Sequence, residues 1–373
     1  MSLIRNAASN GLLSPVDDDM QRAACSPTEL VLSMKEGRPA MLDDRDAEFH
    51  PSSADQLDWA ETNFFGFYNA EAHLNVGVYA LFRPNLGTVS SSVCINSQFA
   101  STPWQADFCD YRAHLPIPNP RSLLDYRLDN SLHVVCTKPN REWTIRYDDG
   151  EGTLIDVAYR AIMLPFDIHD PALDPMCASG SAAGKFAWGT AYYGHFDQSG
   201  HVSGEVRVRG KRYAIDCVST MDHSWGPRPE RGKPNMSWLH AHVDDQTVLH
   251  AIMGFDAMVD DSQLALAHGY VVEGGELRGL ASGSGTVVRR VDRFPDTVEL
   301  VFGDAAGRRY ELTGRALTRF PWQCWPNMVS FNVLAEWQFQ GRKAYGEMQD
   351  FFELPQLNRL NSVTAAARDA SAG

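Results

Sequence analysis

Short segments of alternating apolar and polar residues, separated by turn-forming residues, limit this chain to a β architecture. Apolar runs of about five to ten residues, bounded by Gly, Asn, Asp and Pro, recur from Trp59 to Phe352. Residues 75–83, which read NVGVYALFR, and the turn-forming residues 84–87, which read PNLG, show the pattern. Helical periodicity is confined to residues 26–34, which begin with a capping-box sequence. We therefore predict an all-β fold with one short N-terminal helix.

The strand-like segments fall into two successive sets, which predict two antiparallel barrels or sandwiches. Residues 167–184 are rich in Pro, Gly, Ala and Ser and are typical of a connection. We expect an N-terminal tail with the short helix over 1–44 and a first β domain over 45–185. A second β domain over 186–356 and a flexible C-terminal tail over 357–373 complete the prediction.

Charge and composition argue against several classes of protein. The chain has 33 basic and 47 acidic residues and a net charge of -14, which disfavours binding to nucleic acid or to an anionic membrane. No apolar run approaches the length of a membrane span, and the N-terminal segment lacks the apolar core of a secretory signal. The seven cysteines are odd in number and never spaced as CxxC, which fits reduced thiols in the cytoplasm.

Sequence motifs for common cofactors and nucleophiles are also missing. The chain contains no GxGxxG after a strand, no GxxxxGK[ST], no GxSxG and no HExxH. Nicotinamide, nucleotide and serine-hydrolase chemistry are therefore disfavoured, and we expect no cofactor.

The stretch 192–244 carries the densest set of candidate functional residues. Two strands, Gly204–Arg209 and Arg212–Cys217, flank a Gly210-Lys211 turn and lead into Met221–Gly226, which reads MDHSWG. Neighbouring residues on a regular strand point in opposite directions, so Asp222 and His223 cannot form a simple dyad. We expect one of them to face a cavity and the other to anchor the structure. Alternatively, Asp222 caps a turn and His223 packs in the core with Trp225.

A further strand, Met236–Val243, has a period of two that places Trp238, His240 and His242 on one face. An HxH pair can hold a metal ion, but a site needs a third ligand. We favour two hydrogen-bonded histidines that act as acid or base without a metal, because an imidazole titrates near neutral pH.

Glu71 and His73 form another pair one strand period apart, next to the aromatic run Phe64–Tyr68. An aromatic environment can raise the pKa of a carboxyl and suit it to donate a proton. The alternative is a hairpin turn that exposes both side chains. Tyr345, Glu347 and Gln349 also share a face, either of a surface strand or of a pocket rim, and we favour a structural role. The candidate substrate-binding residues are Phe65, Tyr68, His73, Tyr192, Trp225 and Trp238.

The hairpin Gly204–Tyr213, of the form GxVxVxGxxY, leads into DHSWGPR at Asp222–Arg228. Together they resemble the hydroxyneurosporene synthase (carotenoid 1,2-hydratase)/AttH-like superfamily, in particular a bacterial branch that carries DHSWGPR. The resemblance covers roughly residues 55–350 and is specific at the DHSWG hairpin. Met221 stands where that branch more often has a basic residue. The resemblance implies two lipocalin-like β-barrel domains and a pocket for an apolar substrate, and our domain boundaries place the motif in the second domain.

Hydration of an isoprenoid double bond, as in relatives, needs a strong acid, aromatic faces for the cation and a positioned water. The resemblance assigns the acid to Asp222 and a face to Trp225, and we add Trp238, His240 and His242 from the strand faces. We therefore predict a cofactor-independent lyase, hydratase or isomerase acting by acid–base chemistry on a terpenoid, steroid or aromatic substrate. Two alternatives are a non-catalytic protein that binds a hydrophobic small molecule and an enzyme assisted by a histidine-bound metal. A homodimer is also open.

Overall fold

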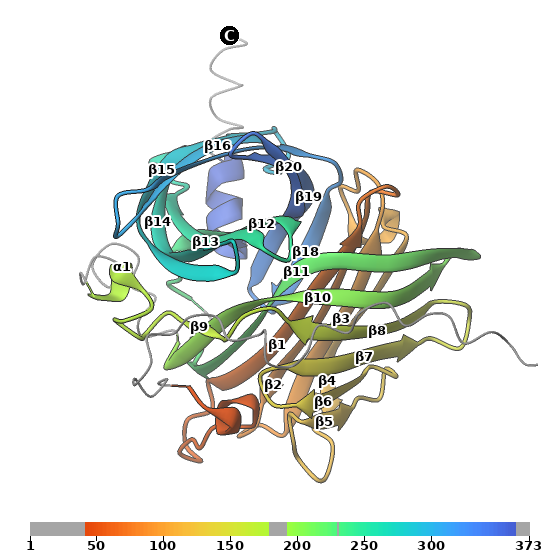
Figure 1. Ribbon diagram of the computed structural model, residues 1–373. Helices are drawn as coiled ribbons and strands as arrows, with labels where there is room; N and C mark the ends of the chain where they lie inside the picture. Colours follow the sequence, from red (N-terminus) through yellow and green to blue (C-terminus); the bar gives the residue numbers. More distant parts are fainter. Residues whose placement is uncertain (1–41, 179–191, 230, 363–373) are drawn as a thin grey trace, which may run out of the picture. The chain divides into compact units, whose positions relative to one another are not determined.

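The computed structural model describes residues 42–178, 192–229 and 231–362, and antiparallel strands make up most of them (Figure 1). Helical segments in this part of the chain are short. They are η1 (Asp44–Ala47), η2 (Pro103–Gln105), α1 (Pro175–Ala178) and a C-terminal helix over 354–362. The all-β prediction is confirmed, whereas the helix predicted over 26–34 lies outside the described residues.

The first sheet has eleven strands in the order β4-β3-β2-β1-β11-β10-β8-β7-β6-β5, with β9 paired to β10, and it curls into a half-barrel. Alternate residues of its strands point into a buried aromatic and aliphatic core, in keeping with the period of two in the sequence. The strands are β1 (Trp59–Asn69), β2 (Leu74–Arg83), β3 (Thr88–Asn96), β4 (Phe108–Pro116), β5 (Asp125–Arg127), β6 (His133–Lys138), β7 (Glu142–Asp148), β8 (Leu154–Ala161), β9 (Phe166–Asp167), β10 (Gly194–Val208) and β11 (Lys211–Pro227).

The second sheet closes into an eight-stranded barrel. Strands β12 to β17 follow one another, β20 pairs with β12, and β17 pairs with β19 to complete the ring, while β18 extends the sheet beyond β19. The strands are β12 (Asn235–Asp244), β13 (Thr247–Asp256), β14 (Asp260–Glu273), β15 (Glu276–Arg289), β16 (Pro295–Asp304), β17 (Arg309–Ala316), β18 (Phe320–Trp325), β19 (Met328–Phe339) and β20 (Arg342–Glu353). The prediction of two barrel-like units is therefore confirmed.

The strand that carries the DHSWG motif belongs to the first sheet. β11 pairs with β10 and with β1, so that Asp222 lies opposite Phe64. The β10–β11 turn consists of Arg209 and Gly210, whose φ angles of 50° and 72° are those of a type I′ hairpin. The sequence pattern places the motif in a second domain that begins at residue 186. The sheets instead divide between β11 and β12, because the long hairpin inserts between β8 and β1.

The C-terminal helix lies within the ring of barrel strands (Figure 1). Leu360 is buried in the barrel core, and Leu357 packs against that core. This differs from the expectation of a flexible tail from residue 357, at least as far as residue 362. The spacing of three between these leucines is the helical signal in the sequence.

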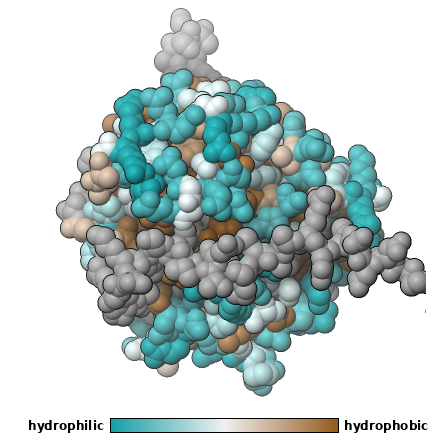
Figure 2. All heavy atoms as spheres, in the orientation of Figure 1, coloured by the Kyte–Doolittle hydropathy of each residue, from teal (hydrophilic) through white to brown (hydrophobic). Residues whose placement is uncertain are grey.

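Hydrophilic residues cover most of the face shown in Figure 2, and apolar residues are visible in small areas between them. The buried apolar side chains are gathered in the cores of the two sheets and in two further clusters that combine residues of both sheets. Among the described residues, no helix has the length and apolar character needed to cross a bilayer.

Candidate functional site

Two small cavities lie between the half-barrel and the barrel. The larger has a volume of about 40 Å³ and the smaller about 20 Å³, which is room for a few water molecules. Phe64 from β1 and Trp322 from β18 border both cavities, so these two rings form the partition between them. The aromatic residues around the larger cavity are Phe64, Tyr79, Tyr192, Trp238, Trp322, Trp325 and Phe351.

Asp222 faces the larger cavity from β11. The residue is partly exposed and is one of those that line the cavity. Burial raises the pKa of the Asp222 carboxyl to about 7, although Arg228 and His195 oppose the rise. The Arg228 guanidinium donates to Ser224 Oγ (2.5 Å) and lies over the Tyr192 ring at 4.4 Å. This cavity therefore combines a carboxyl, a buried cation and aromatic faces.

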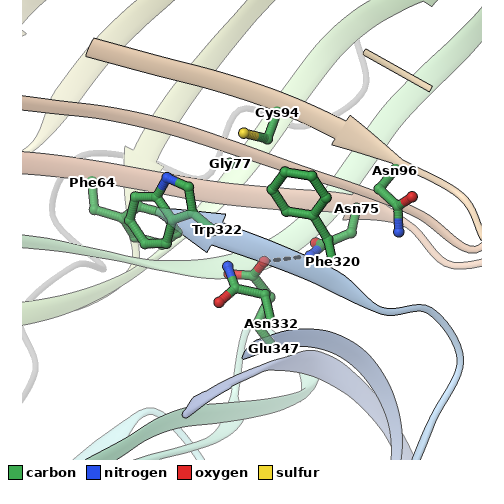
Figure 3. Close-up of a pocket in the computed structure, with 9 residues that line it drawn as sticks. All are labelled: Phe64, Asn75, Gly77, Cys94, Asn96, Phe320, Trp322, Asn332 and Glu347. Carbon is green, nitrogen blue, oxygen red and sulfur yellow. Dashed lines mark hydrogen bonds between the residues drawn. The ribbon is translucent and has the colours of Figure 1, made fainter. Parts of the chain in front are cut away.

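Glu347 faces the smaller cavity from β20 (Figure 3). Asn75 of β2 donates a short hydrogen bond to one carboxyl oxygen, and Gln349 Nε2 donates to the other at 2.9 Å. Burial nevertheless raises the pKa of Glu347 to about 7, since it outweighs these two hydrogen bonds. Rings of Phe320 and Trp322 line the same cavity, so the carboxyl has little water around it.

The histidines predicted on one face of β12 lie between the sheets. The Trp238 and His240 rings are 4.9 Å apart and the His240 and His242 rings 4.6 Å apart, which confirms the shared face. His240 Nε2 lies 3.9 Å from a Glu347 oxygen, and His242 Nε2 lies 2.9 Å from Thr220 Oγ1 of β11. Burial lowers the pKa of both imidazoles well below the ordinary value, so they are neutral at physiological pH.

Asp197 of β10 is a buried anion at the centre of this interface. Its Oδ2 lies 3.0 Å from His195 Nε2 and 3.0 Å from His250 Nε2, and Trp238 Nε1 donates to its Oδ1 at 2.8 Å. Burial alone would raise the pKa of Asp197, but the two histidines outweigh it and hold the pKa well below the ordinary range. Asp197 therefore stays ionised, in contrast to the two carboxyls that face the cavities.

Residues 43–353 match the family described as "Domain of unknown function (DUF7064)". The chain belongs to this family. A search of curated proteins gave no match.

Solved structures share the fold of this DUF7064 protein. An AttH-type protein of Nitrosomonas europaea aligns with a TM-score of 0.51 at 13% identity, over 85% of this chain and 98% of that one. CghA gives a TM-score of 0.51 at 9% identity, over 80% and 88% of the two chains. Kievitone hydratase of Nectria haematococca gives 0.47 at 10% identity, over 79% and 88%. The alignments with the AttH-type protein and with CghA show a shared fold, and the resemblance to the hydroxyneurosporene synthase/AttH-like superfamily stays a prediction.

The DUF7064 fold brings together only part of the predicted site. Asp222, Tyr192 and Trp238 line the larger cavity, His240 lies 3.9 Å from Glu347 of the smaller one, and the His242 ring packs beside that of His240. These five side chains lie in the region between the two sheets, and their common role in one site stays a prediction.

The other predicted residues lie elsewhere. His223 and Trp225 point to the opposite face of β11 from Asp222, as expected for neighbours on a strand. Phe65 and Tyr68 are buried in the half-barrel core. Glu71 and His73 are exposed in the β1–β2 turn, so the alternative interpretation of that segment as a hairpin turn describes the structure.

Sequence reasoning did not select Glu347, Asp197 and Arg228 as site residues. Arg228 belongs to the DHSWGPR sequence, and Glu347 belongs to the strand face assigned a structural role. His195 and Asp197, one strand period apart on β10, are a local signal that sequence reasoning overlooked, but the other partners of Asp197, His250 and Trp238, belong to the other sheet. Long-range pairing of this kind is not visible in a sequence pattern.

Proposed function

We propose that this DUF7064 protein is a lyase, hydratase or isomerase that acts on a hydrophobic small molecule by acid–base chemistry between its two sheets. One observation carries the proposal. The carboxyls of partly exposed Asp222 and of buried Glu347 face adjoining cavities, and aromatic rings make up a large part of both linings. Convergence of ionisable groups in an apolar site is typical of catalysis and is not needed to hold an apolar ligand.

In this proposal Glu347 is the proton donor. Its carboxyl is protonated over part of the neutral range, because burial raises its pKa to about 7. Protonation of a substrate double bond forms a C–H bond and leaves a cation, which the faces of Trp322 and Phe64 stabilise. Neutral His240 then accepts a proton from the attacking water in a hydration, or from the substrate carbon in an isomerisation.

The present cavities are too small for a terpenoid or steroid. Binding in this proposal displaces the partition formed by Phe64 and Trp322, which joins the two cavities and brings both carboxyls to one substrate. The alternative is a binding protein without catalytic activity. In that case the same aromatic rings bind the ligand, and the carboxyls only stabilise the interface between the two sheets. A metal-assisted reaction at His240 and His242 has less support, since these two histidines do not form a cluster with a third possible metal ligand among the described residues in which all three ligand atoms lie within 4.8 Å of one another.

The test is a screen of isoprenoid and steroid-like alkenes and alcohols, followed by kinetics of Glu347→Gln and Asp222→Asn. General acid catalysis typically contributes about 10²–10⁴-fold, so Glu347→Gln is expected to lower kcat by that factor with little change in ligand binding. Asp222→Asn is nearly isosteric and is expected to lower turnover more than the melting temperature, because its carboxyl faces the cavity.

The matched control is Asp350→Asn on the same strand. Asp350 is a buried carboxyl that pairs with Arg289 at 2.7 Å and with Ser237, on the opposite face of β20 from Glu347. This control is expected to lower stability and to leave kcat of the folded fraction unchanged. Ligand binding without turnover in the wild-type protein would favour the binding-protein alternative.

A further inference from the structure

A second cluster of ionisable residues lies on the face of β11 opposite to Asp222. It consists of His50, from the segment before β1, Glu61 from β1 and His223 from β11. One donor atom of each residue lies within 4.8 Å of the other two. His50 Nδ1 is 3.1 Å from Glu61 Oε2, and His223 Nε2 is 3.9 Å from the same oxygen.

Hydrogen bonds around the cluster occupy the other polar atom of each side chain. His223 Nδ1 lies 2.9 Å from the Thr62 carbonyl oxygen, which can only accept, so this nitrogen carries the proton. His50 Nε2 contacts Asp46 Oδ1 at 3.1 Å, and Glu61 Oε1 accepts from the His50 backbone N–H at 2.7 Å. With the His50 proton on Nε2, these bonds leave His50 Nδ1, Glu61 Oε2 and His223 Nε2 facing one another, each with a lone pair. With the proton on Nδ1, His50 instead donates to Glu61 Oε2 at 3.1 Å.

His223 supplies an independent observation. The residue is 2% exposed, and its Nε2 has no hydrogen-bond partner among the residues that the structure describes, although a buried acceptor without one pays the full cost of its lost hydration. A doubly protonated His50 could bridge Asp46 and Glu61, but it would leave His223 Nε2 unpartnered. A cation among the three atoms satisfies all of them at once.

From this geometry we propose that His50, Glu61 and His223 bind a divalent transition-metal ion of the zinc type. Two imidazoles and one carboxylate form a donor set that occurs in both zinc and iron(II) sites. Metal-bound histidines usually have their second ring nitrogen hydrogen-bonded to a backbone carbonyl or a carboxylate, as His223 has to Thr62 and His50 to Asp46. The ion reaches the cluster from the His50 side, where the side chain is 16% exposed. This site differs from the expectation of a chain without bound metal.

The bound ion links the segment before β1 to β1 and β11, two strands that also contribute residues to the larger cavity. His50 stacks on Trp225 at a centroid distance of 3.7 Å, so the metal and the stacked rings hold the same segment. Because Asp222 points to the other face of β11, the ion lies outside the cavities and has a structural role.

The experiment uses the full chain stripped of metal with a chelator and titrated with Co²⁺, followed by visible absorption, and with Zn²⁺, followed by calorimetry. The wild-type protein is expected to bind one ion per chain and to show a d–d spectrum of a protein-ligated cobalt ion. His50→Ala and His223→Gln are expected to abolish that spectrum, and Asp46→Asn to weaken Zn²⁺ binding by about 10–100-fold through the lost orienting contact.

The matched control is His201→Gln. His201 Nε2 lies 2.6 Å from Asp216 Oδ1 on the exposed surface, and this histidine–carboxylate pair has no third metal ligand among the described residues. This variant should bind the ion as the wild type does. Circular dichroism of each variant tests whether it is folded. His50→Ala is the variant expected to disturb the core least, because the His50 side chain is partly exposed. No stoichiometric binding by the wild type, or unchanged binding in folded His50→Ala, overturns the proposal.

Discussion

The Glu347 carboxyl is subject to two opposing influences. Hydrogen bonds from Asn75 and Gln349 favour the ionised form, while burial favours the neutral form and raises the pKa from 4.5 to about 7. Between pH 4.5 and about pH 7, the Glu347 carboxyl therefore keeps its proton in the folded protein and loses it in the unfolded chain. The resulting stabilisation is fully present below pH 4.5 and is lost as the pH rises through about 7.

This pH dependence can be measured without a substrate. Between pH 5 and pH 8, the free energy of unfolding of the wild type should fall by on the order of 3 kcal/mol more than that of Glu347→Gln, since one unit of pKa shift corresponds to about 1.4 kcal/mol. The titratable groups that face Glu347 are His240 of β12 and Cys94 of β3, and both are present in the two proteins. Urea unfolding of both proteins at each pH provides the measurement. Equal pH dependence in the two would show that Glu347 is ionised in the folded state.

At the scale of elements, the β12–β20 contact sets the position of His240. A Cβ atom added at Gly346 would lie 2.1 Å from the His240 carbonyl oxygen and 2.6 Å from its Nδ1, so β20 approaches β12 closely only because residue 346 has no side chain. Gly346→Ala is therefore expected to push the strands apart and to cost about 1–3 kcal/mol of stability.

The control for this substitution is Gly77→Ala on β2. Its added Cβ would meet only Phe64, at 3.5 Å, which is ordinary van der Waals contact. Thermal unfolding of both variants tests the prediction. A melting temperature of Gly346→Ala equal to that of Gly77→Ala would contradict the close approach of β12 and β20.

The elements themselves were largely predictable from the sequence, but their partners were not. The period of two placed Trp238 and His240 on one face of β12, and the ring contacts confirm it. The same argument was wrong for Glu71 and His73, because the chain turns there and His73 adopts a left-handed φ of 51°. Alternation identifies the faces of a strand only where the strand continues.

The pairing of β1 with β11 shows why the site could be predicted only in part. It places Phe64 opposite Asp222, two residues that are far apart in the chain. Turn signals specify only neighbouring strands, so the sequence pattern assigned the DHSWG strand to the wrong sheet. Glu347 was undervalued for the same reason, since Asn75, which bonds to it, comes from the other sheet.

At the scale of the whole molecule, buried polar contacts join the half-barrel to the barrel. Asp197 of β10 contacts His250 of β13 and Trp238 of β12. Ser199 Oγ lies 2.8 Å from Tyr270 Oη of β14, in a second contact between the two sheets. Separating the sheets would leave these groups without partners unless water replaced every bond. We therefore expect the two sheets to unfold together.

Asp197→Asn tests this coupling. Removing one charge of a buried pair typically costs about 3–5 kcal/mol. The pKa of Asp197 is held low, so the stabilisation is complete at pH 7 and is lost only as the pH falls below the ordinary carboxyl range. Differential scanning calorimetry at pH 7 should show one transition for the wild type and one transition at lower temperature for the variant.

Asp350→Asn distinguishes coupled from independent unfolding of the two sheets, because the ion pair between Asp350 and Arg289 lies within the second sheet alone. If the interface couples the two sheets, weakening the barrel lowers the same single transition and the half-barrel unfolds with it. If the sheets were independent, the barrel transition would move to lower temperature while the half-barrel transition stayed in place. Two resolved transitions in Asp350→Asn would therefore contradict a cooperative molecule, and with it a site that depends on both sheets being held in register.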